Sequence, residues 1–61
     1  MKTTVKVYLK DKQGNKDWFV TLINLPEQEA HENYTGKWFN MGREMDHMMK
    51  CWKVETLKVE K

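Results

Sequence analysis

Residues 3–11, TTVKVYLKD, alternate between apolar and polar side chains. A period of two residues is typical of a β-strand with one buried face, because successive side chains of a strand point to opposite sides. We therefore expect a half-buried strand here. Its apolar face holds Val5, Val7 and Leu9, and its polar face holds Lys6, Tyr8 and Lys10.

The next hydrophobic segment, DWFVTLINL (17–25), is apolar at nearly every position. A strand with two apolar faces is typical of the middle of a sheet, and the polar segment DKQGNKD before it predicts a hairpin turn. A two-residue turn that begins at Gly14 would pair Leu9 with Val20, whereas a longer turn with Gly14 in the left-handed conformation would pair Leu9 with Asp17. We expect the first register, because it matches apolar side chains with each other.

Residues 24–36, NLPEQEAHENYTG, have the end signals of a short helix. Asn24 is a candidate N-cap, Pro26 fits the first turn, and Gly36 is suited to close the C-terminal end. The apolar content of the segment is thin, so an ordered loop over residues 26–35 is the alternative.

Residues 42–53 fit the 3.6-residue period of an amphipathic helix, with Asn40 as a candidate N-cap. Its apolar side would cover the hairpin sheet as core, or it would form an adaptable surface for a partner, since methionine is flexible and polarizable. Both interpretations stay open. The apolar side of this expected Met/Trp helix holds Met41, Met45, Met48, Met49 and Trp52.

The two remaining segments contain residues typical of strands. KWFNM (37–41) indicates a short strand, and CWKVETLKVEK (51–61) indicates a last strand whose alternation slips. A β-bulge near Glu55-Thr56 would restore one apolar face. Together these elements predict a single small domain (1–61) of the α+β class. We expect an antiparallel sheet opened by an N-terminal β-hairpin, one Met/Trp amphipathic helix packed on it, and a C-terminal strand at its edge.

The reactive side chains are few. Cys51 is the only cysteine, which excludes an internal disulfide and any zinc site built on paired cysteines. His47 and Cys51 are spaced i, i+4, and with Asp46 and His31 they would make four metal ligands, but this spacing is common by chance. The same His–Cys pair lacks an accompanying oxyanion donor or orienting group. We therefore expect no metal, no cofactor, no catalytic residue and no enzymatic activity.

The chain of 61 residues has a net charge of +2. Residues 1–17 carry five lysines and two aspartates (+3), residues 18–36 carry three glutamates (−3), and residues 37–61 carry six basic and four acidic groups (+2). Such alternation is typical of a mixed, solvated surface. The first residues lack the apolar run of a signal peptide, and the longest apolar run, WFV, is too short for a membrane span. We expect a cytoplasmic protein without membrane contact.

The three tryptophans and five methionines are many for so small a core, and both types are enriched at interfaces. The sequence therefore predicts a non-enzymatic protein–protein interaction module that binds a larger protein, or itself as a homo-oligomer. By analogy, small chains of this kind act as inhibitors or regulators, as many phage and mobile-element products do. The alternative is a nucleic-acid-binding protein that uses Lys6, Tyr8 and Lys10. The expected partner-binding residues are Met45, Met48, Met49, Trp52 and Trp38.

Overall fold

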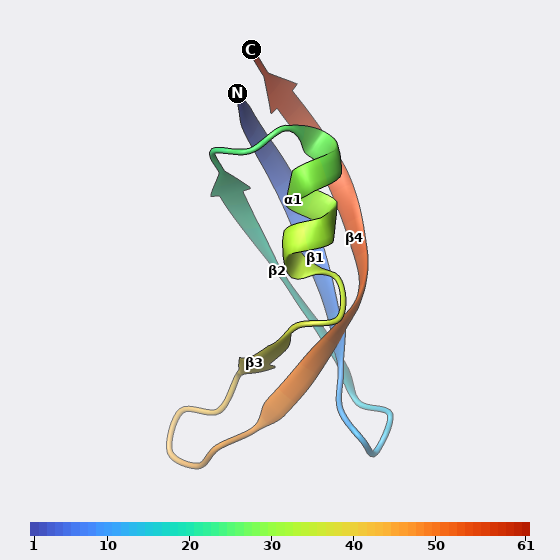
Figure 1. The fold of residues 1–61 in the computed structure, drawn as a ribbon. Helices are drawn as coiled ribbons and strands as arrows, with labels where there is room; N and C mark the ends of the chain where they lie inside the picture. The colour runs from blue at the N-terminus through green and yellow to red at the C-terminus, as the bar shows by residue number, and fades with distance from the viewer.

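The computed structural model describes residues 1–61 and contains four antiparallel strands and one helix. The sheet has the strand order β2-β1-β4-β3, curves into a half-barrel, and carries the helix on one face (Figure 1). The α+β class is thus confirmed, although the helix is short and strands dominate. The elements are β1 (Lys2–Lys10), β2 (Lys16–Ile23), α1 (Glu27–Tyr34), β3 (Trp38–Asn40) and β4 (Met48–Glu60).

Strand β1 and the hairpin are confirmed, but the expected register is wrong. Leu9 lies opposite Asp17, which is the pairing of the longer turn. The cause lies in the turn: the Asp11 carboxylate accepts hydrogen bonds from the backbone N–H groups of Gln13 (2.9 Å) and Asn15 (2.8 Å). Gly14 supplies the positive φ of 89° that this loop needs. Turn chemistry therefore outweighs apolar matching.

The positions of two strands in the sheet also differ from expectation. The segment with two apolar faces forms β2, which is an edge strand and not a central one. The C-terminal strand β4 is an inner strand between β1 and β3, so its expected place at the edge is wrong. The half-buried face of β2 holds Phe19, Thr21 and Ile23, and its exposed face holds Trp18, Val20 and Leu22.

The expected Met/Trp helix over residues 42–53 is wrong. Residues 48–53 belong to β4, where Met48 is exposed and Met49 is buried, so these two neighbours lie on opposite faces. Strand β4 pairs with β1 along nearly its whole length, and its β-branched residues suit a strand better than a helix. Non-local backbone pairing therefore overrides the local helical period.

Residues between β3 and β4 form a tight loop instead of the first turns of that helix. Asn40, expected as an N-cap, accepts hydrogen bonds through Oδ1 from the N–H groups of Gly42 (3.0 Å) and His47 (3.1 Å). Only glycine fits at position 42, because an added Cβ would overlap the backbone carbonyl of Met45. This side-chain-bonded loop competes successfully with helix formation.

Two register shifts interrupt the pairing of β4 with β1. One places Leu57 as an extra residue between Thr56 and Lys58, close to the expected bulge at Glu55-Thr56. The other places Trp52 as an extra residue between Cys51 and Lys53. The sequence pattern did not reveal this second bulge. It lets Cys51 and Val54 both face the core while the Trp52 ring turns outward.

Helix α1 and the short strand β3 are confirmed. The helix begins after Pro26, which occupies the N-cap position without a side-chain hydrogen bond, so the expected capping by Asn24 is wrong. Its C-terminal end is closed by Thr35, whose N–H donates to the His31 carbonyl (3.0 Å), and by Gly36 at a φ of 85°.

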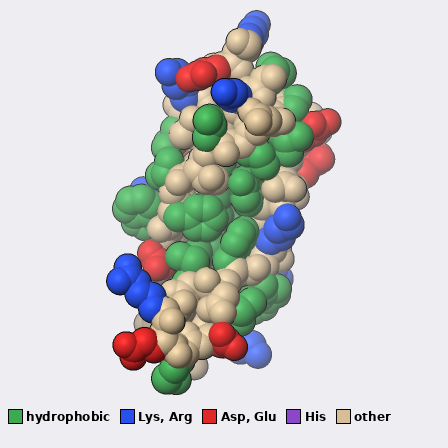
Figure 2. All heavy atoms as spheres, turned by 90° about the vertical axis from the view of Figure 1, so that its left-hand side faces the viewer, with side chains coloured by type: hydrophobic (Ala, Val, Ile, Leu, Met, Phe, Trp, Pro, Cys, Tyr) green, Lys and Arg blue, Asp and Glu red, His purple; other side chains and the backbone are tan.

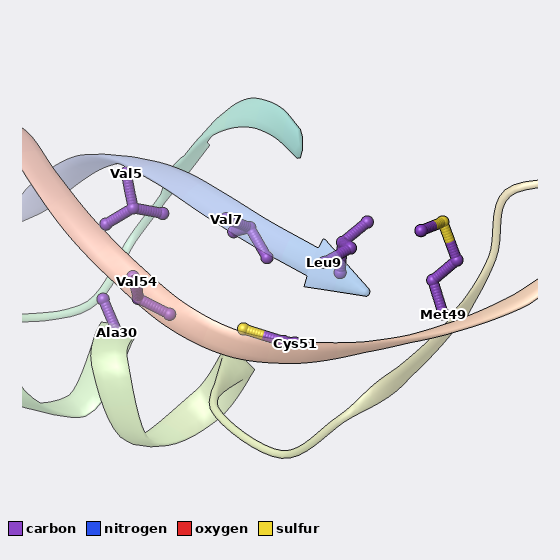
Figure 3. Close-up of a cluster of buried hydrophobic side chains, with 7 residues drawn as sticks. All are labelled: Val5, Val7, Leu9, Ala30, Met49, Cys51 and Val54. Carbon is purple, nitrogen blue, oxygen red and sulfur yellow. The ribbon is translucent and has the colours of Figure 1, made fainter. Parts of the chain in front are cut away.

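Helix α1 covers the core, which β1 and β4 supply almost entirely (Figure 3). The helix is fixed to the sheet by a hydrogen bond between His31 Nε2 and Thr56 Oγ1 of 2.7 Å. A second aromatic layer lies beside this core: Phe19 of β2 and Phe39 of β3 approach with ring centroids 5.3 Å apart. These strands are the two edges of the sheet, so their rings bring the edges of the half-barrel together. The buried side chains are Val5, Val7, Leu9, Ala30, Met49, Cys51 and Val54.

No helix of the structure has the length and apolar character needed to cross a membrane.

Truncation of the core at Leu9 should destabilise the fold strongly, because this side chain of β1 is fully buried in the core cluster beside Cys51 and Met49 of β4. We expect Leu9→Ala to lower the free energy of unfolding by about 2–5 kcal/mol. The matched control is Leu22→Ala on the exposed face of β2, which should change it by less than about 0.5 kcal/mol. Urea titration followed by tryptophan fluorescence measures both, and equal losses would contradict this assignment of the core.

Candidate functional site

The sheet face opposite α1 carries large, exposed aromatic side chains. Trp18, Trp38 and Trp52 are 54%, 47% and 42% exposed. Tryptophan is usually well covered in a monomer, and the only helix packs on the other face of the sheet. The exposed rings therefore mark this face as the candidate site.

Each of the four strands contributes one ring to this face. Tyr8 of β1 lies opposite Trp18 of β2 in the register of the hairpin. Trp52, the extra residue of the β4 bulge, places its ring centroid 6.0 Å from that of Tyr8. Trp38 of β3 lies opposite Lys50 of β4, nearer the loop end of the sheet. The rings thus cross the sheet from one edge to the other.

Lysine ammonium groups lie close to all four rings. The Lys6 Nζ is 4.2 Å from the centroid of the Trp18 ring and 5.0 Å from that of Tyr8. The remaining distances are 5.3 Å from Lys53 to Tyr8, 5.8 Å from Lys10 to Trp52, 5.6 Å from Lys16 to Trp52, and 6.0 Å from Lys50 to Trp38. All lie within the range of a cation–π contact. We call this set the aromatic–lysine face: Lys6, Tyr8, Lys10, Lys16, Trp18, Trp38, Lys50, Trp52 and Lys53.

Among these rings and lysines the electrostatic balance is positive. One carboxylate, that of Glu55, lies on this face and accepts a hydrogen bond from the Tyr8 hydroxyl at 2.9 Å. The glutamates of α1 lie on the helix that covers the other side of the sheet. The sheet therefore lies between the glutamates of α1 and the five lysines of the aromatic–lysine face. The net charges of successive sequence segments did not reveal this arrangement.

The residues expected from the sequence divide between this face and other places. Lys6, Tyr8 and Lys10 lie together as expected, and Trp38 and Trp52 join them. Met49 is only 2% exposed and belongs to the core, where no partner reaches it. Met45 lies 81% exposed in the loop before β4, and Met48 is half-exposed at the start of that strand. The methionines thus form no common surface.

Sequence reasoning missed four members of the aromatic–lysine face. Trp18 lies in the segment that was expected to be covered on both faces, and its place opposite Tyr8 follows only from the longer hairpin turn. Asp11 was a signal for this longer turn, because an aspartate carboxylate often accepts a hydrogen bond from the backbone N–H two residues further along the chain. The other missed residues come from β4 and the start of β2: Lys16, Lys50 and Lys53.

The residues considered as metal ligands are not brought together. His47 Nε2 lies 2.9 Å from Asp11 Oδ2, whereas His31 bonds to Thr56 on the helix side of the sheet. Cys51 is buried, and burial raises the pKa of its thiol. No three His, Cys, Asp or Glu side chains are placed to hold an ion.

The Asp11–His47 contact links the hairpin turn to the loop before β4. The Asp11 side chain is almost covered and also accepts a hydrogen bond from the Asn15 side chain at 3.0 Å. The bond with His47, and then the bonds with Asn15, lower the pKa of Asp11 from 3.8 to about 2. The ionised carboxylate therefore holds both loops in place.

Comparison with protein-family models, with curated proteins and with solved structures finds no match for this chain.

Acidification should loosen the Asp11 turn. Because the folded state lowers the pKa of Asp11 from 3.8 to about 2, its contribution to stability is complete above pH 4 and is lost as the pH falls towards 2. We expect the urea midpoint to drop over this window in the wild type. In Asp11→Asn the starting stability should be lower and the drop smaller. Parallel pH profiles for the two proteins would contradict this role of the carboxylate.

Proposed function

We propose that this protein binds single-stranded nucleic acid through the aromatic–lysine face. The observation that carries the proposal is the presence of one ring on every strand of the sheet, each with a lysine ammonium within about 6 Å. Flat rings stack on unpaired bases, and ammonium groups bind the phosphates that join those bases. Both kinds of side chain alternate across one open surface.

The interaction energies favour replacing a lysine–ring contact with a base stacked on the same ring. An exposed cation–π contact is worth about 0.5–1 kcal/mol. A base stacked on an aromatic side chain contributes about 1–3 kcal/mol. A lysine displaced from a ring by a base keeps its charge and moves to a neighbouring phosphate. The free protein therefore holds its rings and lysines in positions that a strand of nucleic acid can take over.

Single strands fit this surface better than a duplex. In a duplex the bases are stacked on each other and cannot reach Trp18 or Trp52. A helix that enters the major groove would be needed instead, and α1 carries Glu27, Glu29 and Glu32, which repel phosphate. Stacking and lysine–phosphate contacts tolerate any base, so we expect little sequence preference.

Docking onto another protein is a second candidate, favoured by a smaller apolar patch on the same face. Leu22 and Val20 of β2 are half-exposed, and so is Leu57, the extra residue between Thr56 and Lys58 of β4. The two functions depend on different side chains and respond differently to salt. Apolar docking should require Leu22 and persist at high salt, whereas nucleic-acid binding should require the rings and lysines and weaken as salt rises.

Replacement of a ring should weaken binding to oligo(dT) and oligo(U) in low salt. We expect Trp18→Ala to reduce the affinity by about 5- to 150-fold, which corresponds to the loss of one stacked base. Trp18→Phe should restore part of it. The control Leu22→Ala lies on the same strand and face with a similar exposure, 52% against 54% for Trp18, and should bind as the wild type does. Fluorescence anisotropy of labelled oligonucleotides measures all four proteins.

Replacement of a lysine should change the salt dependence. Lys6 contacts two rings of the face, so Lys6→Gln should flatten the slope of log affinity against log salt by about 0.7, the value for one phosphate of a single strand. Lys61→Gln, at the far end of the chain from the rings, should leave the slope unchanged. Absence of binding to either oligonucleotide, or binding that ignores both Trp18→Ala and Lys6→Gln, would overturn the proposed function.

A further inference from the structure

We propose that the outer edge of β2 pairs with β2 of a second copy of this chain, in antiparallel orientation about Val20, so that two sheets join into one. This inference stands on the backbone of β2 and does not depend on the proposed function.

The hydrogen-bond alternation of the hairpin identifies the free backbone groups of β2. The N–H of Asp11 donates to the carbonyl of Asn15 at 3.0 Å, which marks the pair 11–15 as the first bonded position. Bonded and non-bonded pairs alternate along an antiparallel ladder. Odd-numbered residues of β2 therefore bond to β1, and the N–H and C=O groups of Trp18, Val20 and Leu22 point away from the sheet.

One of these outward donors already has a local partner. The N–H of Trp18 donates to the carboxylate of Asp17 at 2.7 Å. The neighbours of Val20 and Leu22 in the sequence are uncharged, and no side chain forms a hydrogen bond with the backbone of either residue. The Asp17 carboxylate thus occupies the outward N–H of Trp18 at the start of the edge. The outward N–H groups of Val20 and Leu22 are open for a partner strand.

β2 also lacks the features that protect the other edges. It contains no proline, its pairing with β1 has no bulge, and residues 18–23 carry no charge. By contrast, β3 has only three residues and pairs only with the first three residues of β4. The part of β4 beyond β3 carries charged side chains and has two bulges in its pairing with β1. Short strands, charges and bulges are how proteins prevent edge pairing. Figure 2 views the molecule from the left-hand side of Figure 1, where both edge strands β2 and β3 lie, and shows a band of hydrophobic side chains with charged groups of both signs around it.

The sequence of β2 is complementary to itself in this orientation. Pairing about Val20 places Trp18 opposite Leu22 of the second copy, and Phe19 opposite Thr21. Lys16 falls opposite Asn24, so no like charges meet. The outward-pointing residues of the two copies then form the bonded pairs. A two-fold arrangement uses both β2 edges at once and closes as a dimer.

Pairing edge to edge also agrees with the charge distribution. Contact between two aromatic–lysine faces would oppose five lysines with five others, which costs free energy. Edge pairing instead keeps both faces open and places them side by side as one surface. The second copy is therefore the occupant that the edge, its sequence and its charges favour together.

The test measures the molar mass and the protection of individual amides. Sedimentation equilibrium from micromolar to millimolar concentration should give twice the monomer mass for the wild type. In the same series, hydrogen exchange by NMR should show the amides of Val20 and Leu22 becoming protected as the concentration rises. Val20→Pro should remain folded, because the lost N–H points outward, and should be a monomer. Val20→Lys should also be a monomer, since two lysines would meet on the two-fold axis.

The matched control is Leu57→Lys, which adds the same charge at a position of similar exposure, 50% against 48% for Val20, but away from the β2 edge. It should remain a dimer. A wild-type monomer at every concentration would overturn the proposal. The same conclusion would follow if both Val20 variants stayed dimeric, or if the wild type grew beyond a dimer without limit.

Discussion

The Asp11 carboxylate fixes the hairpin register, and the rest of the molecule depends on that register. By bonding to the backbone of the turn, it holds Leu9 opposite Asp17. This single shift places Phe19 on the side of α1 and sends Trp18 to the opposite face. With the alternative register, the side chains of β2 would change faces. The core would gain Trp18 and lose Phe19, and the open face would carry the ring of Phe19 in place of that of Trp18.

Local signals in the sequence predicted the elements whose partners are close in the chain. The alternation around Val5 and Val7 identified β1, and the Pro26 and Gly36 signals bounded α1 to within a few residues. These features succeed because a strand period or a helix end depends on a few neighbouring residues. The register failed for the opposite reason: it depends on which backbone groups one carboxylate bonds, and hydrophobic periodicity does not contain that information.

The segment that became β4 shows how two periods can coexist in one sequence. Met41, Met45 and Met48 follow a helical spacing, but Met49, Cys51 and Val54 face the core of a strand once the bulge at Trp52 is counted. The choice between them is made by β1, about forty residues earlier in the chain. For the same reason only Lys6, Tyr8 and Lys10 of the aromatic–lysine face could be grouped beforehand, because they share one strand, whereas their neighbours arrive through pairing.

Separation of charge by the sheet has an effect before any contact is made. The three glutamates of α1 and the five lysines of the aromatic–lysine face lie on opposite sides of the sheet, so they contribute an electric dipole that crosses it. In the field of a negatively charged body, such a dipole experiences a torque that turns the lysine side forward. At physiological ionic strength the field reaches only about 8 Å, so this rotation belongs to the last steps of diffusion. A protein that tumbles freely at larger distances would then reach a polyanion with its lysine side turned towards it.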